Sequence, residues 1–78
     1  MSERWPVKEL SERDAEIFKI LVVHWVNHNG EHVKDYAEWA DKTRTAHPEV
    51  AAAIDESIDC MRSAAGKLME AKIHFQNS

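Results

Sequence analysis

Three of the chain's five histidines stand four residues apart, at His24, His28 and His32. At 3.6 residues per turn, this spacing stacks them in a column along one side of a helix. Imidazole nitrogens bind nickel, zinc and copper, and a nearby carboxylate or thiolate can extend such a ligand set. The pattern therefore predicts a site for nickel, zinc or copper, with the candidate ligands His24, His28, His32, Glu31 and Cys60.

Two other interpretations of the histidine column remain open. A row of imidazoles inside a helical protein can be a polar layer that sets helix register, or a seam that responds to pH. The zinc-protease pattern HExxH is absent, because Trp25 follows His24 and Asn29 follows His28. The column therefore indicates binding or packing, and we expect no enzyme activity.

A long helix is predicted to carry the column. Ser11 and Asp14 have the spacing of an N-terminal capping box, and a dense apolar periodicity begins at Ile17. The apolar phase continues through Gly30, which predicts one helix over about 11–45 and leaves a kink at Gly30 open. The expected seam of this helix consists of Phe18, Val22, Trp25, Asn29, His32, Tyr36, Trp39 and Thr43.

A second helix is predicted over about 48–76, because Pro48 suits a first helical position and a second apolar seam follows it. The fold class is therefore all-α, a long antiparallel helical hairpin in which residue n lies opposite about residue 93 − n. This register places the histidines against the small residues 63–66 and near Cys60, Met61 and Met69. Because His28 and His32 fall inside the apolar stripe, we expect them to be partly buried.

The chain has 78 residues, which is room for one helical domain over 1–78 with an N-terminal arm at 1–10. A chain of this size buries only a small core. Two helices alone are expected to leave the large side chains of Trp25, Trp39 and Phe75 exposed to solvent unless another helix packs on them. We therefore expect the hairpin to pair into a four-helix bundle, as a homodimer or with another helical protein.

The amino-acid composition limits which partners and which cellular compartment we expect for this chain. The net charge is −4, without a stripe of Lys and Arg, so nucleic acid is not expected as a partner. The longest apolar run, at 20–23, is far shorter than the roughly 20 residues that span a membrane. A single cysteine permits no disulfide within the chain and favours a reducing, cytoplasmic setting.

The segment HWVNHNGEHVKDYAEWA, residues 24–40, resembles a line of the type H-W-x-x-H-N-x-E-H found in small uncharacterised prokaryotic helical proteins. The resemblance also implies that some of these proteins accompany nickel-handling proteins. The resemblance covers about a quarter of the chain and implies a hairpin fold. It draws attention to His24, His28, Glu31 and His32, while Gly30 departs from the charged helix former that is usual there.

The sequence thus predicts a small non-catalytic protein that binds a transition metal through its histidine column, as a metal chaperone, store or sensor. The alternative is a helical protein-interaction module with structural histidines and no metal.

Overall fold

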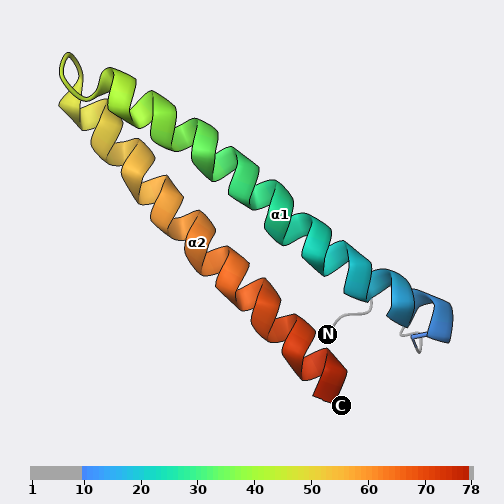
Figure 1. The fold of residues 1–78 in the computed structure, drawn as a ribbon. Coiled ribbons are helices and arrows are strands. Elements are labelled where there is room, and N and C mark those ends of the chain that lie inside the picture. The colour runs from blue at the N-terminus through green and yellow to red at the C-terminus, as the bar shows by residue number, and fades with distance from the viewer. Residues whose placement is uncertain (1–9, 78) are drawn as a thin grey trace, which may run out of the picture.

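The computed structural model describes residues 10–77, and these form two antiparallel helices with no strand (Figure 1). Helix α1 spans Glu12–Thr43 and helix α2 spans Pro48–Asn77, and a short turn at 44–47 joins them. The pair is an all-α hairpin about 53 Å long, as predicted. The predicted N-terminal arm lies outside the described residues, apart from Leu10. Neither helix of the described part combines the length and hydropathy that crossing a bilayer requires.

Helix α1 begins where the capping pattern predicted. Ser11 has extended backbone angles (φ −75°, ψ 162°), and its hydroxyl accepts a hydrogen bond from the Asp14 backbone N–H at 3.0 Å. This bond satisfies one of the amide groups that a helix start leaves without a partner. The helix then continues through Gly30 without interruption, and Gly30 keeps a negative φ. The prediction of a single long helix is confirmed.

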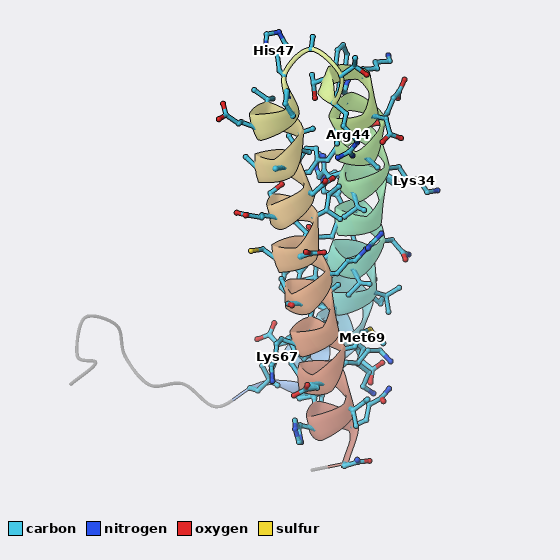
Figure 2. All side chains as sticks on the ribbon, turned by 90° about the vertical axis from the view of Figure 1, so that its left-hand side faces the viewer. Lys34, Arg44, His47, Lys67 and Met69 are labelled. Carbon is cyan, nitrogen blue, oxygen red and sulfur yellow. The ribbon has the colours of Figure 1, made fainter. Side chains whose placement is uncertain are left out.

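The turn is held at both of its ends. At the end of α1 the Thr43 hydroxyl donates to the Trp39 carbonyl at 2.8 Å, and the His47 amide donates to the Thr43 carbonyl at 2.7 Å. Arg44 reaches across to α2 and donates to both oxygens of Asp55, at 2.9 and 3.3 Å (Figure 2). These hydrogen bonds lower the pKa of the Asp55 carboxyl and raise that of Arg44. The two helices are therefore tied together beside the turn.

The register of the hairpin agrees with the prediction to within one helical turn. The rings of Phe18 and Phe75 meet edge to face, with their centroids 4.9 Å apart. Further along, the Asn29 side-chain amide donates to the Met61 backbone carbonyl at 3.3 Å. An amide in the middle of an apolar seam disfavours register shifts, because sliding the helices would leave it without this partner.

The core between the helices is thin. Its buried members among the described residues are Val22, Ala40, Ala51 and Ile58, and Val22 is the one large side chain that is fully buried. Of the predicted seam of α1, Trp25, Tyr36 and Trp39 remain 42%, 37% and 56% exposed, which agrees with the expectation that two helices leave Trp25 and Trp39 uncovered, whereas Phe75 is half-buried against Phe18. The apolar stripe of α1 is wider than one facing helix can cover, and α2 covers the flank that carries Val22 and Ala40. A wide apolar face is left in contact with solvent.

Candidate metal site

The three histidines form a continuous column on α1. The rings of His24 and His28 lie nearly parallel with centroids 5.9 Å apart, and His28 meets His32 edge to face at 4.5 Å. Tyr36 extends the column, with its ring centroid 6.0 Å from that of His32. One uninterrupted helix therefore positions the four rings in a row, as the spacing predicted.

The closest approach in the column is between two ring nitrogens. Nε2 of His28 and Nε2 of His32 lie 3.1 Å apart. Two nitrogens bound to one zinc ion at about 2.0–2.1 Å are about 2.8–3.4 Å apart for angles between about 90° and the tetrahedral value. The same distance suits a hydrogen bond in which one neutral imidazole donates to the other. The separation alone is thus compatible with either a shared proton or a shared metal ion.

Glu31 lies on the other side of the His28 ring. Its Oε1 atom is 3.9 Å from Nδ1 of His28, and the two side chains are 77% and 58% exposed. A carboxylate at the second ring nitrogen of a ligating histidine fixes the tautomer that leaves Nε2 free to bind a metal. At 3.9 Å the Glu31 carboxylate is an exposed neighbour of Nδ1 and is beyond hydrogen-bond distance, and it lies on the Nδ1 side of the ring rather than beside both Nε2 atoms.

Two of the candidate ligands, His24 and Cys60, lie outside the His28–His32 pair. His24 stacks on His28 and is exposed, and Cys60 is an exposed thiol on α2. Within residues 10–77, no three side chains of His, Cys, Asp or Glu gather around one point as a complete metal site would require. The structure thus brings His28 and His32 together, places Glu31 beside them, and leaves His24 and Cys60 outside the pair.

The expected burial of the histidines is wrong for His28, which is exposed, whereas His32 is half-buried. The physical reason is the position of α2, which packs against the opposite flank of the apolar stripe. Asn29, rather than His32, faces Met61 across the interface. Sequence reasoning did not single out Asn29, although a polar residue in the middle of the seam was a signal for such a contact.

An apolar groove of about 670 Å³ lies between the helices toward the turn. It is lined by Tyr36 and Trp39 of α1 and by Ile54, Ser57, Cys60 and Met61 of α2. Lys42 lies over the Trp39 ring, with its ammonium nitrogen 4.5 Å from the ring centroid. The groove begins where the histidine column ends, because Tyr36 belongs to both.

The family model described as "Domain of unknown function (DUF8180)" matches residues 18–75. The chain belongs to this family. The matched region of DUF8180 contains the histidine column, the turn and nearly all of α2. Searches among curated proteins and among solved structures found no match.

Proposed function

We propose that this DUF8180 hairpin binds a transition-metal ion without catalysing a reaction, as a metal chaperone, store or sensor. The observation that supports the proposal is the 3.1 Å separation of the Nε2 atoms of His28 and His32. In this proposal these two nitrogens are the primary ligands, and the Glu31 carboxylate, now 3.9 Å from Nδ1 of His28, moves within hydrogen-bond distance of Nδ1 when the ion binds. His24, which stacks on His28, and Cys60, an exposed thiol of the facing helix, are the further candidate donors in this proposal. Nickel, copper and zinc all accept imidazole nitrogen.

We also propose that the hairpin pairs with another hairpin in a four-helix bundle. Within residues 10–77, the core contains one large, fully buried side chain, Val22, which is little for two helices of 32 and 30 residues. Eleven large apolar side chains of the described residues are more than a third exposed. Pairing would remove part of this apolar surface from water, which is favourable by roughly 25 cal/mol per Å².

Metal analysis of the full chain, purified without a histidine tag, tests the proposed binding. Titration calorimetry with nickel, copper and zinc follows, on the natural chain and on His28→Ala and His32→Ala. We expect each variant to lose at least about tenfold in affinity, or 1.4 kcal/mol, because a chelating nitrogen is removed. His47→Ala is the matched control, since His47 lies at the turn (Figure 2), outside the helix that carries the column. Absence of binding, or equal binding by all four proteins, would exclude the proposed site.

A second candidate function is a protein-interaction module, and the apolar groove favours it. Tyr36 and Trp39 line this groove while 37% and 56% exposed, and aromatic side chains are frequent anchors at protein interfaces. In that case the histidines would be a structural row linked by the Nε2–Nε2 hydrogen bond. A metal-free chain whose melting temperature is unmoved by all three metals would favour this alternative.

A further inference from the structure

Two imidazole nitrogens are half of the ligand set of a four-coordinate metal site. Zinc in proteins takes four ligands, and nickel and copper also form four-coordinate nitrogen sites. His28 and His32 supply two nitrogens, and no third His, Cys, Asp or Glu of residues 10–77 completes a cluster with them. We propose that a second copy of this chain completes the site with its own His28 and His32, so that four imidazoles surround one ion on a two-fold axis. This inference rests on the proposed metal binding.

The position of the pair along α1 suits a two-fold axis. Helix α1 spans Glu12–Thr43, so its midpoint falls between Asn27 and His28. The middle of the histidine pair is at residue 30, less than one turn away. If two α1 helices pack antiparallel about an axis at this level, residue n lies opposite residue 60 − n. His28 of each copy then faces His32 of the other, and residues 17–43 of the two helices overlap.

The side chains around the pair form one continuous face. At 100° per residue, the directions of Leu21, Trp25, His28, His32 and Trp39 fall within about 60° of one another. Leu21, Trp25 and Trp39 are 37%, 42% and 56% exposed in the single chain. Under the 60 − n pairing, Trp39 of one copy covers Leu21 of the other. The contact that assembles the metal site would therefore also bury apolar surface on both sides of it.

The charges at the ends of this face are complementary. Lys42, which pairs with Glu38 of its own helix at 3.0 Å, lies opposite residue 18 of the second copy, and Asp14 is one turn from that residue. The two-fold axis repeats this proximity of opposite charges at both ends of the helix pair. An antiparallel arrangement also sets the dipoles of the two α1 helices in opposition, as is usual for neighbours in a bundle.

The first test is stoichiometry. Zinc chloride is added to the full chain without a histidine tag, and native mass spectrometry and analytical ultracentrifugation measure bound metal and mass. We expect one zinc ion per two chains and a zinc-dependent shift toward the dimer. One zinc per single chain, or two per pair of chains, would overturn the shared site while leaving metal binding intact. Absence of bound zinc here would overturn the shared zinc site, and absence of binding in the calorimetric titrations with nickel, copper and zinc would remove the proposed function itself.

The second test asks whether the contact between two chains is needed for zinc binding when all the histidine ligands are kept. Trp39→Glu changes the proposed interface without removing a nitrogen, and Ile20→Glu makes the same kind of change at a 70% exposed residue on another side of α1. Circular dichroism checks that both variants stay helical. We expect Trp39→Glu to weaken zinc binding by at least about tenfold and Ile20→Glu to leave it unchanged. Equal zinc affinity in the two variants would show that one chain holds the ion alone.

Discussion

Replacing Gly30 by alanine should stabilise the hairpin. Gly30 is exposed in the middle of α1, it keeps a negative φ, and a methyl group built on it meets no atom within 4 Å. Glycine in a helix interior is less favourable than alanine by about 0.8–1.0 kcal/mol, because its unfolded backbone has more conformational freedom. Since no contact opposes the change, we expect Gly30→Ala to raise the free energy of unfolding by nearly this amount. In a domain of this size, that corresponds to a melting temperature about 4–8 °C higher.

Thermal and urea unfolding followed by circular dichroism, at one fixed chain concentration, measure the effect. Gly66→Ala is the matched control, because Gly66 lies in the interior of α2 and its added methyl group also meets nothing within 4 Å. The increases in the free energy of unfolding should add in the double variant, since the new methyl groups share no neighbour.

A loss of stability in Gly30→Ala would refute this reasoning. It would mean that another molecule approaches the backbone at Gly30 in solution. Gly30 projects from the side of α1 opposite to Trp39, at about 180° on the helical wheel. A destabilised Gly30→Ala would therefore also place the contact between chains on the wrong face for the proposed shared site.

Two further predictions concern the core and the turn. Val22→Ala removes two methyl groups from a fully buried side chain, so we expect a loss of about 1.6 kcal/mol in the free energy of unfolding, at about 0.8 kcal/mol per buried carbon. The neighbouring Val23→Ala, at a 43% exposed position, should change it by less than about 0.5 kcal/mol, and a similar loss in both variants would contradict the described core. Because Arg44 lowers the pKa of Asp55, the stabilisation from this pair is complete above the unfolded-state pKa of about 3.9 and disappears as pH falls through the lower folded-state value. The melting temperature of Asp55→Asn should thus lie below that of the natural chain at pH 7 and converge with it below pH 4, whereas Asp59→Asn should show no such convergence.

Much of the fold was predictable because the signals were local. Ser11 marked the start of α1, Pro48 marked the start of α2, and apolar periodicity carried α1 through Gly30. The flank of α1 that turns inward was not predictable in the same way. Trp25 and Trp39 on one flank, and Val26 and Val33 on the other, are equally apolar in sequence, but a single facing helix covers one flank.

The candidate site was likewise predictable only where the signal is local in the sequence. The four-residue spacing predicted that His28 and His32 would be neighbours on α1, and they are. The separation of their Nε2 atoms depends on side-chain rotamers, which the spacing leaves free. The position of Cys60 depends on how the two helices rotate against each other, and this rotation placed its thiol in the groove lining beside Tyr36 and Met61.

The hairpin register has a consequence for how the chain folds. Contacts between the helices join residues at steadily increasing separation in sequence, from 11 residues for Arg44 with Asp55 to 57 for Phe18 with Phe75. The entropy lost on closing a loop grows with its length, so contacts beside the turn form at the lowest cost and each one shortens the loop that the next must close. We therefore expect the contacts between the helices to form in order from the turn toward the open end. The side-chain amide of Asn29 would fix the register midway. Phe18 and Phe75, at the far end, would be the last to close and the first to separate.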